Sequence, residues 1–192
     1  MDAVWVSLRW PGIEHARLDQ GVEHYQADSG AILVLEGAPI RVEYRLAWDI
    51  QWRARELLIR TESPGGVNRL ELRSDGGGTW TDGEGTHLPG LDGCIDIDIA
   101  MTPLTNTLPI RRLGLAVGER REMDVVYVKM PDLVVVPVTQ SYEFLEATNE
   151  GALYRYQSST FQAELSVDRN DLVVSYPTVW ERVPVSETER SL

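Results

Sequence analysis

Hydrophobic and polar residues alternate along much of the chain with a period of two residues. The clearest run spans residues 40–49, where apolar side chains from Ile40 to Trp48 alternate with mostly charged ones. Successive side chains of a β-strand point to opposite faces, so this pattern predicts a strand with one buried and one solvated face. Residues 68–73 and 160–168 repeat the pattern.

Other segments extend this prediction over most of the chain. Apolar runs predict further strands at residues 4–10, 31–35, 52–60, 94–99, 125–128, 133–136, 138–145, 153–157 and 172–176. Residues 125–128 and 133–136 are apolar on both faces, so we expect them deep in the fold or at a subunit contact. The run 52–60 slips out of phase, which predicts a β-bulge near Glu56. Turn-forming residues between the runs include Asp28-Ser29-Gly30, Glu36-Gly37 and Pro64-Gly65-Gly66.

Helix is scarce in this pattern. The best candidate is Leu108–Leu113, where Thr107 can cap the first turn, Pro109 suits it and Gly114 can end the helix. One or two helical turns cannot cover the apolar face of roughly ten to twelve strands. The sequence therefore predicts an all-β fold: a curved antiparallel sheet forming a half-barrel or open barrel around an apolar cavity.

Composition limits the class of protein. The 192 residues are consistent with one domain over residues 1–184, followed by a frayed polar tail at 185–192. The single cysteine, Cys94, excludes an intrachain disulfide and favours a reducing compartment. The 18 basic and 30 acidic residues give a net charge of −12, which repels nucleic acid. We find no signal peptide or membrane span in the sequence, and we expect a cytoplasmic protein that does not insert stably into membranes.

The residues with most chemical potential lie in one stretch of the chain. Asp96 and Asp98 share a face of a predicted strand, about 6.6 Å apart, a spacing compatible with acid–base chemistry on a sugar or with a bound cation. The alternative is a solvated strand face whose charge is neutralised by Arg111 or Arg112. Adjacent residues of a helix point about 100° apart, so the second arginine is free to meet an anionic or hydroxyl group of a ligand.

Motifs for other chemistry are missing from the sequence. The three histidines lack metal-ligand spacing, and there is no nucleophile elbow, P-loop or dinucleotide-binding glycine pattern. We therefore predict no catalytic residue set, no metal site and no cofactor. Six tryptophans provide broad apolar faces with one N–H donor each. Trp80 follows three glycines, so we expect it to be the tryptophan nearest an opening.

The segments Gly93–Asp98 and Thr102–Leu113 resemble a bacterial family of glycolipid-binding proteins whose function is largely uncharacterised. Tyr44, Asp49-x-x-Trp52, Trp80, Gln140-x-Tyr142, Val167-Asp168 and Tyr176-Pro177 add to the resemblance, in the same order. It implies a half-barrel with a hydrophobic cavity, similar to periplasmic lipoprotein carriers, and a glycolipid ligand. Leu104 and residues 169–171 depart from the family pattern. The predicted ligand-binding residues are Trp52, Trp80, Asp96, Asp98, Asn106, Arg111, Arg112, Gln140 and Tyr142.

Three functional hypotheses follow. The leading one is non-catalytic binding of a glycolipid or similar amphipathic small molecule. The second is an enzyme that acts on a sugar or lipid through Asp96 and Asp98. The third is a structural or interaction domain that forms a homodimer through residues 125–128 and 133–136, which is compatible with the first.

Overall fold

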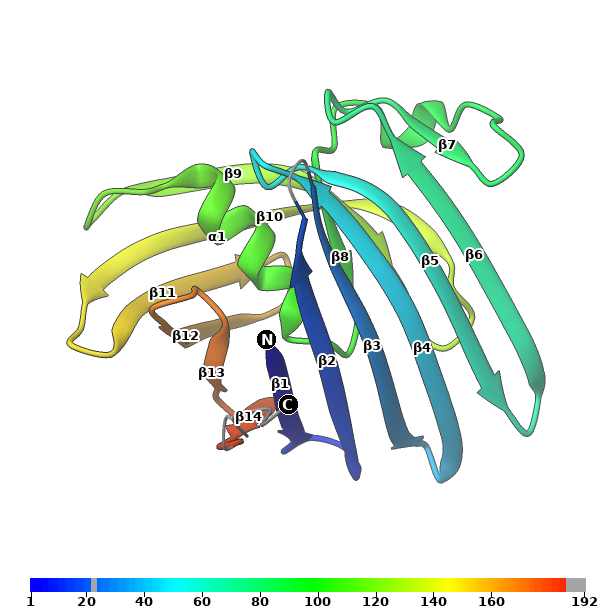
Figure 1. The fold of residues 1–192 in the computed structure, drawn as a ribbon, viewed down its shortest axis with the longest axis horizontal. Helices are drawn as coiled ribbons and strands as arrows, with labels where there is room; N and C mark the ends of the chain where they lie inside the picture. Colours follow the sequence, from blue (N-terminus) through cyan, green and yellow to red (C-terminus); the bar gives the residue numbers. More distant parts are fainter. Residues whose placement is uncertain (22–23, 186–192) are drawn as a thin grey trace, which may run out of the picture.

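The computed structural model describes residues 1–21 and 24–185, which form one curved sheet of fourteen strands (Figure 1). The strands are β1 (Asp2–Ser7), β2 (Gly12–Gln20), β3 (His24–Leu35), β4 (Ala38–Asp49), β5 (Ala54–Ser63), β6 (Gly66–Ser74), β7 (Trp80–Asp82), β8 (Asp96–Ile99), β9 (Arg120–Val128), β10 (Val135–Ala147), β11 (Gly151–Ser158), β12 (Gln162–Asp168), β13 (Val173–Tyr176) and β14 (Trp180–Val183). The helical elements are η1 (Pro89–Leu91), η2 (Leu104–Asn106) and α1 (Thr107–Leu113).

The sheet is continuous but not closed. Its strand order is β7-β6-β5-β4-β3-β2-β1-β14-β13-β12-β11-β10-β9-β8, so the first and last strands of the chain pair in the middle. All neighbours are antiparallel except β8 and β9, which are parallel. The predicted all-β open half-barrel is confirmed.

The period-two pattern identifies the inner face correctly in β4. Ile40, Val42, Tyr44, Leu46 and Trp48 are all buried, at no more than 5% exposure. The predicted bulge is also present, because Ala47 pairs with Glu56 whereas Trp48 pairs with Ala54, which leaves Arg55 as the extra residue. At the predicted Glu36-Gly37 turn both residues have positive φ, of 50° and 83°, as a tight hairpin turn requires.

One predicted turn is wrong, and β2 was not predicted. Asp28-Ser29-Gly30 lies inside β3, paired on one side with β2 and on the other with β4. The inner face of β2 presents Glu14 and Ala16, and Leu18 is its one large apolar residue that packs against the core. Pairing with two neighbouring strands outweighs the turn preference of the Asp-Ser-Gly sequence, because local propensity is a weak constraint.

The two doubly apolar runs differ in the structure. In β9, Val125 and Val126 point to opposite faces and are both buried, which confirms the prediction of a deep strand. In the second run, Val134 is 49% exposed and β10 begins only at Val135. The homodimer remains a prediction.

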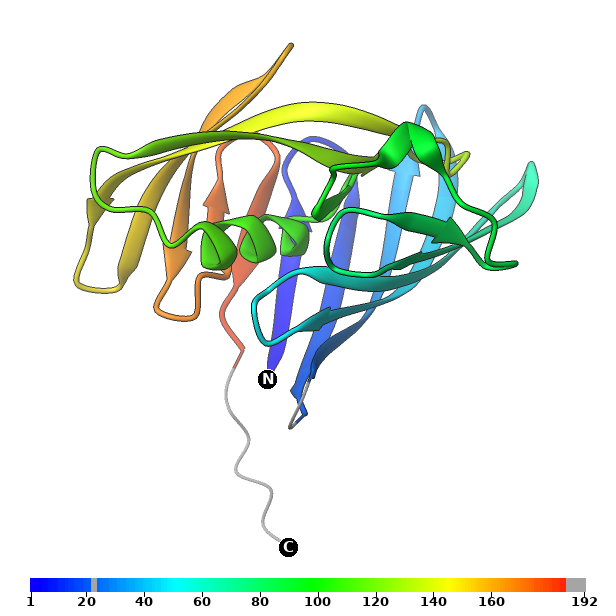
Figure 2. The same cartoon turned by 90° about the horizontal axis from the view of Figure 1, so that it is seen from above.

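A helical segment lies inside the curve of the sheet (Figure 2). It starts earlier than predicted, because η2 runs directly into α1, and it ends at Gly114 as predicted, with φ of 53°. Thr107 does not cap it; its hydroxyl donates instead to the Asp171 carbonyl at 2.9 Å. Leu104 and Leu108 are fully buried.

Short side chains leave room for this helical segment. The buried inner positions of β1, β2 and β3 include four alanines: Ala3, Ala16, Ala27 and Ala31. Protein interiors are close-packed, so small side chains on a sheet leave more room for an element that packs over them. The interior of the half-barrel is thereby divided, with pockets on either side of the helical segment.

Candidate functional site

Two adjoining pockets lie within the half-barrel, and we refer to them together as the inner cleft. The first has a volume of about 560 Å³ and the second of about 740 Å³. They share six residues: Arg9, Trp10, Ala100, Met101, Tyr127 and Lys129. Each volume lies in the range typical of small-molecule sites, about 300–1,000 Å³.

The first pocket, the aromatic compartment, has walls of large rings. They belong to Trp10, Tyr127, Tyr156, Phe161, Tyr176 and Trp180. Phe161 and Tyr176 contact each other with ring centroids 5.8 Å apart, and Tyr156 lies 6.1 Å from Tyr176. Aromatic rings with hydroxyl or N–H groups at their edges suit ligands that are part apolar and part polar, such as sugars.

A fixed polar network lies in the same compartment. Gln140 Nε2 donates to Asp98 Oδ2 at 2.6 Å, and the Thr105 hydroxyl donates to Asp98 Oδ1 at 3.1 Å. Burial raises the pKa of Asp98, while the hydrogen bonds from Gln140 and Thr105 oppose that rise. Asn106 is held by the Tyr142 hydroxyl, which donates to its Oδ1 at 2.7 Å. The structure brings Asp98, Asn106, Gln140 and Tyr142 together, and the first three line the cleft, while their role in ligand binding stays a prediction.

The second pocket, the aliphatic compartment, has a different lining. Its alkyl side chains come from the β3–β4 turn, from the residues after β8 and from the β9–β10 turn: Leu35, Ala38, Ile40, Met101, Met130 and Pro131. These side chains offer an alkyl chain apolar contact, and the polar residues Glu36 and Ser63 line the same pocket. The inner cleft therefore joins a compartment suited to a sugar-like group with one suited to a hydrocarbon tail.

Asp96 has a separate environment from Asp98. It is 1% exposed, and Arg112 Nε donates to its two carboxylate oxygens at 3.0 and 3.1 Å while Arg112 Nη2 bonds Oδ2. Burial raises the pKa of Asp96, and the guanidinium opposes that rise. The solvated strand face considered for the two aspartates is wrong, because Asp96 is 1% exposed and Asp98 is only partly exposed. The neutralisation by an arginine, considered with it, is found for Asp96 and Arg112.

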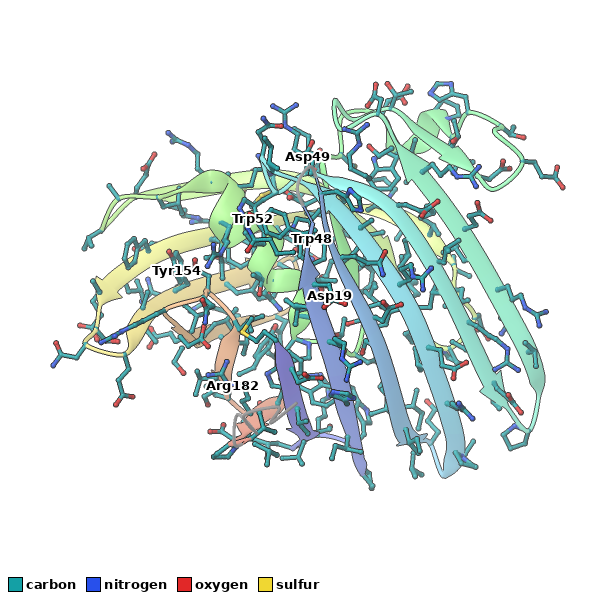
Figure 3. All side chains as sticks on the ribbon, in the orientation of Figure 1. Asp19, Trp48, Asp49, Trp52, Tyr154 and Arg182 are labelled. Atoms are coloured by element: carbon teal, nitrogen blue, oxygen red, sulfur yellow. The ribbon has the colours of Figure 1, made fainter. Side chains whose placement is uncertain are left out.

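Arg111 and Trp52 lie in a third pocket, of about 510 Å³. The Arg111 guanidinium lies 4.5 Å from the centre of the Trp52 ring and forms an ion pair with Asp171 at 3.0 Å. Trp48 and Trp52, labelled in Figure 3, are stacked with ring centroids 5.8 Å apart. The two arginines therefore do separate as predicted, but Arg111 contacts an aromatic ring and a carboxylate of its own chain.

Trp80 does not lie near an opening, so that prediction is wrong. The side chain is fully buried, and its Nε1 donates to the Cys94 carbonyl at 2.6 Å. This bond ties the start of β7 to the segment just before β8. Burial also raises the pKa of the Cys94 thiol to about 11, which opposes a reactive thiolate.

Sequence analysis did not identify Glu14, although it is the most completely buried carboxyl group on the inner face. Its Oε1 accepts hydrogen bonds from Ser29, Tyr44 and Thr102 at 2.7–2.8 Å, and its Oε2 has no hydrogen-bond partner in the described structure. Burial raises its pKa. The sequence did contain one indication of its burial: Glu14 is two residues before Ala16, so the two side chains lie on the same, buried face of β2.

The Glu14 network also holds the helical segment in place. Thr102 donates to Glu14 and accepts a hydrogen bond at 3.1 Å from the backbone N–H of Leu104, the first residue of η2. A single carboxyl group thus connects strands β2, β3 and β4 to the start of the helical segment. We read this network as structural.

Within residues 1–21 and 24–185, no group of three His, Cys, Asp or Glu side chains is placed to hold a metal ion. No helix in the same part of the chain is both long and apolar enough to cross a membrane.

These features define an open antiparallel half-barrel with an internal helical segment and a cleft beside it. Residues 2–182 match the family described as "Putative glycolipid-binding", and the chain belongs to that family. The crystal structure of a DUF1089 family protein from Pseudomonas aeruginosa is similar, with 41% sequence identity and a TM-score of 0.80 over 88% of this chain and 92% of that chain. No curated protein gave a significant match.

Proposed function

We propose that this protein binds an amphipathic ligand of the glycolipid type in the inner cleft, without catalysing a reaction on it. The observation that carries the proposal is the meeting of an aromatic, polar compartment with an aliphatic one inside the half-barrel. A sugar-like head and an alkyl tail joined in one molecule need these two surroundings side by side. The family description supports the same ligand class.

The environments of the two aspartates support binding over catalysis. Both oxygens of Asp98 accept hydrogen bonds from Gln140 or Thr105, and Asp96 is engaged by Arg112. A general acid or base has to exchange a proton with the substrate, which requires direct reach to the reacting group. Held in this way, Asp98 instead offers a fixed acceptor surface to a ligand hydroxyl.

The proposal is tested by native mass spectrometry of protein purified without detergent, followed by organic extraction of any bound lipid. Val138→Trp introduces a large ring into the aromatic compartment, which Val138 lines, whereas Thr139→Trp places the same ring on the exposed face of β10. We expect a co-purifying amphiphile with the wild type and with Thr139→Trp, and its loss with Val138→Trp. Protein that is ligand-free and also fails to take up any added amphiphile would overturn the proposal.

A further inference from the structure

The junction between the two compartments carries two cations. Arg9 and Lys129 are among the six residues that line both pockets, and both are exposed. Lys129 is the only lysine of the chain, whose net charge is −12. The junction therefore concentrates positive charge in an acidic molecule, which favours an anionic group of a ligand at this position.

Neither cation is neutralised by a neighbouring carboxylate. In the described part of the chain, most arginines form an ion pair within 4.0 Å: Arg17, Arg41, Arg45, Arg55, Arg60, Arg73, Arg111, Arg112, Arg120, Arg121, Arg155 and Arg182. In the described structure Arg9 and Lys129 form no ion pair, and neither do Arg53, Arg69 and Arg169, which line neither compartment. The Arg9 guanidinium lies over the Trp10 ring instead, 5.1 Å from its centre.

The two carboxylates that line the cleft form no ion pair within 4.0 Å with either cation in the described structure. Glu36 lines only the aliphatic compartment, and Asp98 lines only the aromatic one, where Gln140 and Thr105 already bond it. The cleft therefore has an order of chemistry along its length: a polar aromatic end, a positive junction and an aliphatic end.

We propose that the ligand carries an anionic group, of the phosphate type, at the point where its polar head joins its apolar tail, and that Arg9 and Lys129 bind that group. The inference rests on the proposed function, since it assumes that head and tail occupy the two compartments. A guanidinium offers a planar pair of donors to phosphate oxygens, and an ammonium adds a point charge. The ligand class is then a sugar or polyol joined to a lipid through a phosphate, rather than a neutral glycolipid.

The test compares two soluble amphiphiles below their micelle concentrations by isothermal titration calorimetry. Octyl inositol phosphate has a polyol ring joined to an octyl tail by a phosphate, and octyl glucoside has a sugar joined to the same tail without charge. We expect the phosphate-linked probe to bind roughly tenfold more tightly at low salt, with an advantage that shrinks as salt screens the exposed cations. Inositol phosphate without a tail should bind far more weakly than the lipid.

Charge-removing variants with similar side-chain length locate the effect. Arg9→Met with Lys129→Met should abolish the advantage of the phosphate-linked probe and change octyl glucoside binding by less than about twofold. Arg69→Met is the matched control, because Arg69 is exposed on β6 and has no ion pair in the described structure. It should leave both affinities unchanged.

The outcomes separate the two proposals. If neither amphiphile binds the wild type, the proposed function fails. If both bind equally well, or if the double variant keeps the preference for phosphate, amphiphile binding stands and the anionic junction is wrong. If inositol phosphate binds as tightly as the lipid, the cations serve a free phosphate ligand and the placement of the anion between head and tail is wrong.

Discussion

Arg112→Met should destabilise the fold by exposing the cost of a buried carboxylate. Asp96 is 1% exposed and receives its charge compensation from one guanidinium, which bonds both of its oxygens. Removing one partner of a buried ion pair costs about 3–5 kcal/mol, because the remaining charge stays out of water. We expect the free energy of unfolding to fall by about 3 kcal/mol at pH 8.

This loss should depend on pH in a defined direction. Burial already raises the pKa of Asp96, and loss of the opposing guanidinium raises it further. A carboxyl group with a raised folded-state pKa is best tolerated below its unfolded pKa, near 4, and becomes destabilising as pH rises through the folded value. The cost of Arg112→Met should therefore be small near pH 4 and reach its full size at higher pH.

Urea unfolding followed by circular dichroism at pH 5 and pH 8 measures both effects. The double variant Asp96→Leu with Arg112→Met is the control, because apolar replacement of a whole buried pair is often neutral. It should recover most of the lost stability at pH 8. A loss below about 1 kcal/mol for Arg112→Met, or a double variant no more stable than the single one, would refute the reasoning.

Three further changes test the interior. Glu14→Gln keeps the shape of the buried group without its charge. Burial raises the pKa of Glu14, so the buried carboxyl group loses its stabilising proton as pH rises. The variant should therefore be about 1–2 kcal/mol more stable than wild type in thermal melts at pH 8 but not at pH 4. Leu108→Ala should cost about 2–5 kcal/mol in urea unfolding, because Leu108 is fully buried; a smaller cost would mean that the helical segment packs loosely. Gly151→Ala should be severely destabilising, since its Cβ would lie 1.9 Å from the Val167 carbonyl oxygen. In Gly30→Ala the added Cβ meets nothing within 4 Å, so this variant should gain about 0.5 kcal/mol in the free energy of unfolding. Equal melting temperatures of the two variants would contradict this reasoning.

The fold class could be predicted from the sequence because large apolar residues occupy the inner face of the sheet wherever that face packs against other large side chains. β4 is the clearest example, with Ile40 to Trp48 in strict alternation. β2 and the first half of β3 escaped the same reasoning. Their inner positions include Ala16, Ala27 and Ser29, and such short residues give no clear hydrophobic periodicity.

The candidate site was predictable in part. The segment around Asp98 and Asn106 drew attention because polar residues repeat on a strand and then enter a helix, and the structure brings both to the inner cleft with Gln140. The aromatic wall was not identified, because Tyr156 and Tyr176 come from separate strands, and only the curvature of the sheet brings their rings together. Lys129 was not identified from the sequence either, because the junction is formed by residues far apart in the chain. Arg9 lies between β1 and β2, whereas Lys129 directly follows β9.

The most direct test of the inner cleft as the ligand site is the methyl NMR spectrum of protein labelled at its four methionines, recorded while an amphiphile is added. Met101 and Met130 line the aliphatic compartment, whereas Met123 lies beside Arg112, with its sulfur 3.6 Å from Nη2. The account predicts that the Met101 and Met130 signals shift to saturation while Met123 stays unchanged. Saturable binding that leaves Met101 and Met130 unmoved would contradict it.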